Sequence, residues 1–170
     1  TNLMFHQALS LAQEGDVIVV NAGGDTSRGV CGENMIEIAK ERGVRGFVVD
    51  GVIRDAAAAR AQTDFAVFAR GAEANAAFNF GSTGEINVPV AVGGIIVYPG
   101  DILVGDEDGI VAIRPQNAAK VLQDVKALTE KQETNLELIK KGVSDRSWLR
   151  KMLEEAGCQI IDKAWYEDEA

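Results

Sequence analysis

Two short apolar runs on either side of a helical pattern restrict the fold of this chain more than any other feature. The runs are VIVVN at residues 17–21 and GFVVD at residues 46–50. Continuous apolar runs of this length predict strands that are buried on both faces. Between them a helix is predicted to open at Glu33 and to stop at Gly43, a residue type suited to a helix C-terminus. Strand, helix and strand joined by short links are typical of a βαβ unit with parallel strands. The helix residues expected to face inward are Met35, Ile36, Ile38 and Ala39.

The rest of the chain extends this α/β unit. A short helix is predicted near the N-terminus, and a third strand near residues 65–69. Residues 86–114 contain several short apolar stretches separated by tight glycine-containing turns, which predicts a compact antiparallel or barrel-like layer. Pro115 is expected to begin a long helix that ends near Gly142, and a second helix is expected at residues 148–155. The acidic end, residues 166–170, is expected to be loose.

Composition excludes several classes of protein. The chain has 170 residues and a net charge of −9, which argues against the basic surface that nucleic-acid binding needs. No apolar run approaches the roughly 20 residues of a membrane span. The two cysteines form no recognisable disulfide framework and no targeting segment is expected, so we expect a cytoplasmic protein. Because the sequence starts at Thr1 and enters a helical pattern at once, we also expect an N-terminal segment to be missing.

Arg54 and Asp55 are the first candidates for a functional site. They follow the second predicted strand, beyond a turn expected at Asp50-Gly51, and ligands of α/β proteins bind outside the carboxyl ends of strands. Arg54 could hold an anionic substrate and Asp55 a metal ion. A surface ion pair or a helix cap is the alternative interpretation.

Glu33 is the second candidate, at the end of a glycine-rich loop that follows the first strand. It could simply complement the dipole of the helix that it begins. Alternatively, the free N–H groups of residues 32–35 could form a cradle for a substrate carboxylate. In a βαβ unit the ends of the two parallel strands are neighbours. The loop and the Arg54-Asp55 pair are therefore expected to converge on one cleft.

Other kinds of site fit the sequence poorly. The glycine-rich loop has neither the ending of a P-loop nor the G-x-G-x-x-G of a dinucleotide fold. His6 is the single histidine, which excludes a histidine-rich zinc site, and we expect it to be packed or partly buried. Cys31 lacks a second histidine as its base and is interpreted as a small buried residue. The lysines lie on predicted polar helix faces, so a Schiff-base aldolase is not expected and a divalent metal is the better electrophile.

With these residues identified, the chain resembles the RraA-like family, which includes class II 4-hydroxy-4-methyl-2-oxoglutarate aldolases. The resemblance rests on NLMFHQAL, GDVIVV, the GG…GE loop, AKERGVRGFVVDGVIRD and VYPGDILVGDEDGIVAI. The aldolase branch is marked by an acidic residue, twenty intervening residues and then Arg-Asp, which Glu33 and Arg54 satisfy. The resemblance implies an α/β fold, a layered βαβ sandwich or barrel-like swivelling domain with C-terminal helices. We expect this domain at residues 1–142 and a helical tail at residues 143–170.

The resemblance also implies a role for each site residue. The backbone N–H groups of Gly32, Glu33, Asn34 and Met35 would bind the pyruvyl carboxylate. Arg54 would bind substrate and stabilise the enolate oxygen, Asp55 would ligate Mg²⁺ or Mn²⁺, and Glu33 would hold water molecules on the metal. The family implies a homotrimer or hexamer in which a neighbouring subunit adds an acid, for which Glu107 or a residue of the C-terminal helix is a candidate.

The resulting hypothesis is a metal-dependent retro-aldol cleavage of a 4-hydroxy-2-oxo acid to pyruvate and a carbonyl product. Oxaloacetate decarboxylation, which passes through the same enolate, is an expected side activity. One departure from the family is AAAA at residues 56–59, where an acidic residue is common. A non-enzymatic regulator of ribonuclease E is the main alternative. A methyltransferase is a weaker one, because no glycine motif for S-adenosylmethionine is present.

Overall fold

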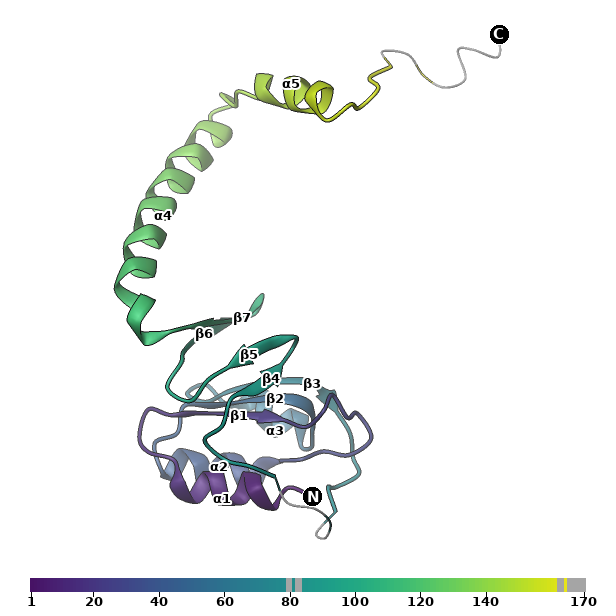
Figure 1. Ribbon diagram of the computed structural model, residues 1–170, viewed down its shortest axis with the longest axis vertical. Helices are drawn as coiled ribbons and strands as arrows, with labels where there is room; N and C mark the ends of the chain where they lie inside the picture. Colours follow the sequence, from purple (N-terminus) through teal and green to yellow (C-terminus); the bar gives the residue numbers. More distant parts are fainter. Residues whose placement is uncertain (79–80, 82–83, 162–163, 165–170) are drawn as a thin grey trace. The chain divides into compact units, whose positions relative to one another are not determined.

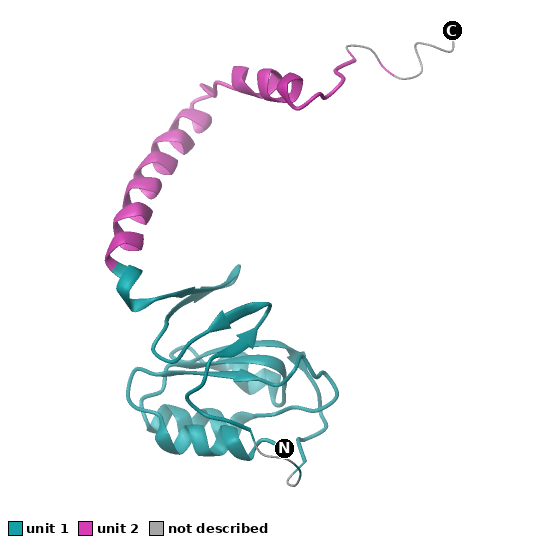
Figure 2. Cartoon of the chain, viewed as in Figure 1, with its two compact units in different colours: residues 1–118 teal, residues 119–170 magenta. Residues whose placement is uncertain are grey.

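The protein forms two compact units, Thr1–Ala118 and Ala119–Ala170 (Figure 2). The structure, a computed structural model, describes residues 1–78, 81, 84–161 and 164. The acidic end that we expected to be loose lies outside the described residues. The sequence predicted a different division, with an α/β domain at residues 1–142 and a helical tail at residues 143–170, and that division stays a prediction.

A parallel sheet of three strands, in the order β1-β2-β3, forms the centre of the first unit. Its strands are β1 (Val17–Asn21), β2 (Gly46–Ile53) and β3 (Ala66–Ala72), and α2 (Glu33–Glu41) connects the first two. The predicted βαβ unit is therefore confirmed. The turn predicted at Asp50-Gly51 is wrong, because β2 continues to Ile53 past an irregularity between Val49 and Val52.

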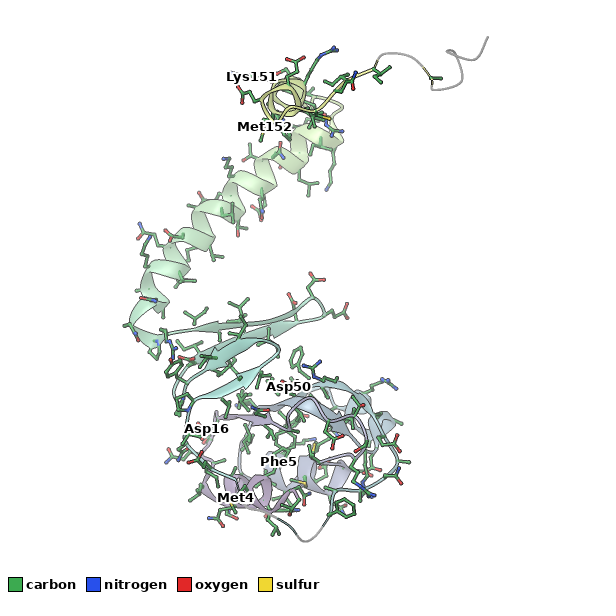
Figure 3. The ribbon with its side chains drawn as sticks, turned by 45° about the vertical axis from the view of Figure 1, so that its right-hand side comes forward. Met4, Phe5, Asp16, Asp50, Lys151 and Met152 are labelled. Atoms are coloured by element: carbon green, nitrogen blue, oxygen red, sulfur yellow. The ribbon has the colours of Figure 1, made fainter. Side chains whose placement is uncertain are left out.

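The main core lies between one face of this sheet and the helices α1 (Leu3–Leu11), α2 and α3 (Ala56–Ala61) (Figure 1). Phe47 of β2 is fully buried there and meets Phe5 and Phe65 edge to face, with ring centroids 4.9 Å apart in both pairs. Figure 3 shows Phe5 between α1 and the sheet. Aromatic contacts of this geometry add to the free energy gained from burial.

Two expectations about burial are wrong, one for β1 and one for α2. β1 is an edge strand in which only Ile18 is buried, whereas the central strand β2 is buried along nearly its whole length. In α2 the side chains of Met35, Ile36 and Ala39 are buried as predicted. Ile38 is 42% exposed.

Two antiparallel hairpins follow the sheet, as the turn pattern predicted: β4 (Val90–Val92) with β5 (Ile95–Val97), and β6 (Ile102–Asp106) with β7 (Gly109–Ile113). They lie on the side of the sheet opposite α1 and α2 (Figure 1). Asp50 of β2 links the two layers, because its carboxylate accepts hydrogen bonds from the Arg70 side chain and from the N–H of Gly93 in the β4–β5 turn.

The second unit is helical. Pro115 begins a short 3₁₀ turn that leads into α4 (Ala118–Lys140), and α5 (Ser147–Glu155) follows. Both helices match the predicted ones, and Gly142 after α4 has the positive φ of +74° that is common past helix ends. None of the described helices combines the length and hydrophobicity of a membrane span. Apolar side chains exposed along α4 are Leu122, Val125, Leu128, Leu136, Leu138 and Ile139.

Candidate functional site at the end of β2

The glycine-rich loop and the end of β2 lie against each other. After β1 ends at Asn21, the chain loops out and returns beside β2. The N–H of Val30 donates to the carbonyl of Val52 at 3.0 Å, and the N–H of Arg54 donates to the carbonyl of Cys31 at 2.7 Å. The convergence expected for a βαβ unit is thus present in the backbone itself, and it sets Arg54 and Asp55 beside the residues that begin α2.

Asp55 has an unusual backbone and a specific partner. Its φ of 55° and ψ of 41° lie in the left-handed region, which few non-glycine residues occupy. The residue stands at the N-cap of α3, but its side chain does not cap that helix. Instead, Oδ2 accepts the N–H of Glu33 at 3.0 Å. This N–H belongs to the first turn of α2, where the helix dipole stabilises a negative charge.

Two glycines allow this close approach. A Cβ atom at Gly32 would lie 2.3 Å from Oδ2 of Asp55, and one at Gly29 would lie 2.4 Å from Cγ of Arg54. Real Cβ atoms do not approach other atoms so closely. Arg54 and Asp55 can therefore pack directly against the loop because residues 29 and 32 are glycines.

Arg54 is half-buried, and its guanidinium has no hydrogen bond or ion pair within the described part of the chain. The ion pair between Arg54 and Asp55 that was the alternative interpretation is not formed. A guanidinium without a partner among the described residues can bind a carboxylate with two parallel hydrogen bonds.

The predicted N–H cradle is partly occupied by the protein itself. The N–H of Glu33 donates to Asp55, and the N–H of Met35 donates to the carbonyl of Gly32 at 3.0 Å. The N–H groups of Gly32 and Asn34 have no acceptor among the described residues. The side chains of Glu33 and Asn34 are exposed, whereas that of Met35 belongs to the core. Two of the four N–H groups, rather than all four, thus lack an acceptor within the described part of the chain, and of these two residues Gly32 is buried and Asn34 exposed.

Cys31 and His6 take different positions. Cys31 is buried beside Asp55, and burial together with the Asp55 charge raises the pKa of its thiol to about 12. The thiol therefore stays protonated and is a poor nucleophile, which agrees with its interpretation as a small buried residue. His6 is exposed on α1, so the expectation that it is packed was wrong.

A divalent cation fits the carboxylate of Asp55, although this chain supplies few ligands. Oδ1 of Asp55 accepts no hydrogen bond from the described residues, and these residues contain no group of three acids, histidines or cysteines that could hold a metal. Mg²⁺ commonly binds through one or two carboxylates and keeps several waters. The donor set suits that ion and would not form a closed zinc site.

The sequence interpretation missed the segment after β3. The N–H of Glu73 donates to the carbonyl of Ile53 at 2.9 Å, and the N–H of Gly29 donates to the carbonyl of Asn75 at 2.8 Å. This segment therefore crosses the end of β2 next to Arg54. A signal was present, because Glu73 directly follows the third parallel strand and its carboxyl end shares the same sheet edge.

The chain belongs to the RraA-like family, described as Aldolase/RraA, whose profile matches residues 1–112. A protein of Halalkalibacterium halodurans with the name "Putative 4-hydroxy-4-methyl-2-oxoglutarate aldolase" is 40% identical over 157 residues. That match covers 89% of this chain and 72% of the relative.

Solved structures agree with the fold. Streptomyces coelicolor RraAS2, an unusual member of the RNase ES inhibitor RraA protein family, has a TM-score of 0.71 at 31% identity and covers 78% of this chain and 67% of its own. A Geobacillus kaustophilus protein named as an S-adenosylmethionine:2-dimethylmenaquinone methyltransferase has a TM-score of 0.62 at 31% identity, covering 66% of this chain and 68% of its own. The α/β fold class is confirmed, while the names of these relatives point to different activities.

Proposed function

We propose that this protein is a divalent-metal-dependent aldolase that cleaves 4-hydroxy-2-oxo acids, such as 4-hydroxy-4-methyl-2-oxoglutarate, to pyruvate and a carbonyl product. One observation carries the proposal. Arg54 and Asp55 follow each other at the carboxyl edge of the sheet, and among the described residues neither the half-buried Arg54 guanidinium nor Oδ1 of Asp55 has a partner. A cation site beside an anion site is what a 2-oxo acid requires, since its carboxylate and ketone oxygens can bind to both.

The roles follow from the positions of the side chains. Asp55 would hold Mg²⁺ or Mn²⁺, which when bound supplies a Lewis acid that polarises the 2-oxo group. The N–H groups of Gly32 and Asn34 would bind the substrate carboxylate. Glu33 is exposed beside them and would orient water that accepts the proton of the 4-hydroxyl group. As the C3–C4 bond breaks, its electron pair passes to C3, and Arg54 stabilises the oxygen of the resulting enolate until C3 is protonated to give pyruvate.

Oxaloacetate should also be a substrate, because loss of carbon dioxide leaves the same enolate. The test is pyruvate release, followed with lactate dehydrogenase, from oxaloacetate and from 4-hydroxy-4-methyl-2-oxoglutarate. We expect activity with Mg²⁺ or Mn²⁺ and none with EDTA. Asp55→Ala should abolish the metal-dependent turnover, whereas Asp64→Ala, which removes an exposed acid that pairs with Lys40, should not. Full activity of the Asp55→Ala protein would refute the site assignment.

A regulator of ribonuclease E-type activity is the second candidate, favoured by the similarity to RraAS2. Such a protein would act through its surface, and the site at β2 would be dispensable. No pyruvate from either substrate, together with inhibition of a ribonuclease E-type enzyme, would favour this function. The methyltransferase name of one structural relative finds no support in a glycine motif for S-adenosylmethionine in this chain.

We propose that the protein is cytoplasmic and assembles as a homotrimer or hexamer. With no cluster of ligands among the described residues, an acid from a neighbouring subunit would complete the cation site. Glu107, in the exposed turn between β6 and β7, remains a candidate for that acid. The partner of the site would be a small 2-oxo acid, with no nucleic acid or membrane involved.

A further inference from the structure

Asp55 is held in a position that neither its backbone nor its own helix favours. The residue is in the left-handed region, and its carboxylate turns away from the N-terminus of α3 to accept the N–H of Glu33 at 3.0 Å. A non-glycine residue keeps such a backbone only where the surrounding structure determines it. The neighbours of this carboxylate should therefore include the group that fixes its position.

The space that receives the carboxylate exists because residue 32 is glycine. A Cβ atom there would lie 2.3 Å from Oδ2 of Asp55 and 3.3 Å from its Cγ. The backbone of Gly32 is extended, with φ of −156° and ψ of −168°, which any residue can adopt. The backbone conformation therefore does not require glycine at position 32. Glycine is required there because a side chain would collide with the Asp55 carboxylate.

We propose that Gly32 is the positioning residue for Asp55. Its missing side chain lets Oδ2 reach the N–H of Glu33, which anchors one carboxylate oxygen and leaves Oδ1 as the single oxygen for a divalent cation. The proposal rests on the aldolase function put forward above. It adds that Gly32, which has no side chain, determines which oxygen of Asp55 binds the divalent cation.

The position of the clash makes this testable without loss of the fold. The atoms nearest to the added Cβ belong to a side chain, so Gly32→Ala can be accommodated when the Asp55 carboxylate rotates away from Glu33. Gly71 is the matched control. It pairs with Val52 near the same end of β2, and a Cβ at Gly71 would meet only Cγ1 of Val52, at an ordinary 3.8 Å.

The first experiment measures Mn²⁺ binding by the full-length chain, followed by electron paramagnetic resonance or calorimetry. We expect Gly32→Ala to weaken binding by about tenfold or more, in the range found when a group that orients a metal ligand is lost. Gly71→Ala should bind Mn²⁺ as the wild type does. Wild-type affinity in the Gly32→Ala protein would overturn the proposal.

The second experiment needs neither metal nor substrate. Thermal unfolding is compared for Gly32→Ala in the wild-type background and in the Asp55→Ala background, as a double-mutant cycle. If Gly32 acts through Asp55, the substitution lowers the unfolding midpoint by about 4 °C in the wild type and by much less when the carboxylate is absent. An equal decrease in both backgrounds would contradict the proposal.

The two measurements separate this inference from the aldolase function. A wild-type protein that binds no Mn²⁺ and releases no pyruvate would refute the proposed function. The unfolding cycle would still decide whether Gly32 positions Asp55. Conversely, an active, Mn²⁺-binding wild type with an unimpaired Gly32→Ala variant would leave the function standing and remove the role of Gly32.

Discussion

Arg54 and Asp55 are adjacent in the sequence but are held by different groups. The backbone N–H of Arg54 is fixed by the carbonyl of Cys31, and its guanidinium is left without a partner in the described part of the chain. Asp55 has one oxygen fixed by the N–H of Glu33, and its other oxygen accepts no hydrogen bond from the described residues. A half-buried charge without a protein partner interacts with a ligand more strongly than one in bulk water, because the effective dielectric constant is lower. Both side chains are thus left ready for a ligand by the same backbone arrangement.

Replacing Arg54 should therefore affect the reaction far more than the fold. We expect Arg54→Ala to lower kcat/KM for pyruvate release by about 100-fold or more, because a donor to the enolate oxygen is lost. Arg54→Lys should restore only part of this, since an ammonium group cannot form two parallel hydrogen bonds. Steady-state kinetics would measure both, with the exposed Arg60→Ala as the control. Unchanged kinetics in Arg54→Ala would contradict the assigned role.

At the residue scale, the sequence predicted which residues lie close together but not their backbone conformation or hydrogen bonds. The spacing of Glu33 and Arg54 and the strand before Asp55 were sufficient to bring the three residues to one edge. The left-handed backbone of Asp55 and its bond to the Glu33 N–H could not be predicted, because both depend on where the returning loop lies in space. The exposure of His6 was also missed, since a lone histidine in a helical pattern does not show which face is covered.

The segment that returns beside β2 acts as a short additional strand at the scale of secondary structure. Gly29 forms parallel bridges with Val52 on one side and with Ala76 on the other. The loop after β1 and the segment after β3 are thereby tied to the end of β2. The site is built on paired backbone rather than on a free loop, which restricts its motion.

Gly29 should be more sensitive to substitution than Gly32. A Cβ at Gly29 would lie 3.0 Å from the backbone N of Arg54 and 3.0 Å from the carbonyl carbon of Ile53, so the added methyl group meets backbone that cannot rotate away. We expect Gly29→Ala to lower the free energy of unfolding by about 2 kcal/mol. Urea unfolding would measure this, and Gly71→Ala should change stability little. A fully stable Gly29→Ala protein would mean that the returning segment is not closely packed.

Asp50 joins the sheet to the β4–β5 hairpin, and its charge makes this link dependent on pH. The hydrogen bond from Arg70, and more weakly that from the N–H of Gly93, holds the pKa of the Asp50 carboxyl below its usual range. A group whose pKa is lowered in the folded state stabilises the protein above the pKa it has when unfolded, near 3.9, and loses this contribution as the pH falls through the folded value.

Asp50→Asn should therefore lower the thermal unfolding midpoint at pH 7, and the difference from the wild type should shrink as the pH falls from about 4 through the lowered pKa of the folded carboxyl. Differential scanning calorimetry at several pH values would follow it. Asp64→Asn, at an exposed acid, is the control. A difference that stays constant down to pH 3 would show that the charge of Asp50 does not carry the link.

The hydrophobic periodicity and the turn residues correctly predicted the type and the order of most helices and strands. The βαβ unit, the antiparallel layer and both C-terminal helices are present as expected. The end of β2 was placed too early because Asp50-Gly51 resembles a turn, whereas here Gly51 is a strand residue whose Cβ would lie 2.8 Å from that of Ala22. Burial of β1 was overestimated, because an apolar run does not show whether a strand has neighbours on both sides.

Over the whole molecule, many large apolar side chains remain exposed for a chain of this length. They occur in both units, in the β5–β7 region as well as along α4 and α5. Extended apolar surface of this kind usually marks a contact with another protein. Together with the proposed cation site, which has few ligands of its own among the described residues, this supports the proposed homotrimer or hexamer. Members of this set are Ile95, Ile96, Val104, Val111, Leu128, Trp148 and Met152.

The assembly can be tested by sedimentation equilibrium. We expect the wild type to have the mass of three or six chains. Val125→Glu combined with Leu128→Glu, which puts two charges on the apolar stripe of α4, should shift the protein towards smaller species. Lys126→Glu lies on the same helix and is the control for added negative charge. A monomeric wild type would refute the proposed assembly.

The left-handed backbone of Asp55 also affects how this protein would respond to selection. Glycine adopts that conformation without the penalty of about 1 kcal/mol that other residues incur. Asp55→Gly would therefore relax the chain at the position where the proposed chemistry depends on a carboxylate. The same substitution removes the carboxylate that accepts the N–H of Glu33, so the loss of that hydrogen bond offsets the relief of backbone strain. The two effects on stability oppose each other at Asp55, so selection for heat resistance alone gives no clear advantage to a protein that has lost the carboxylate.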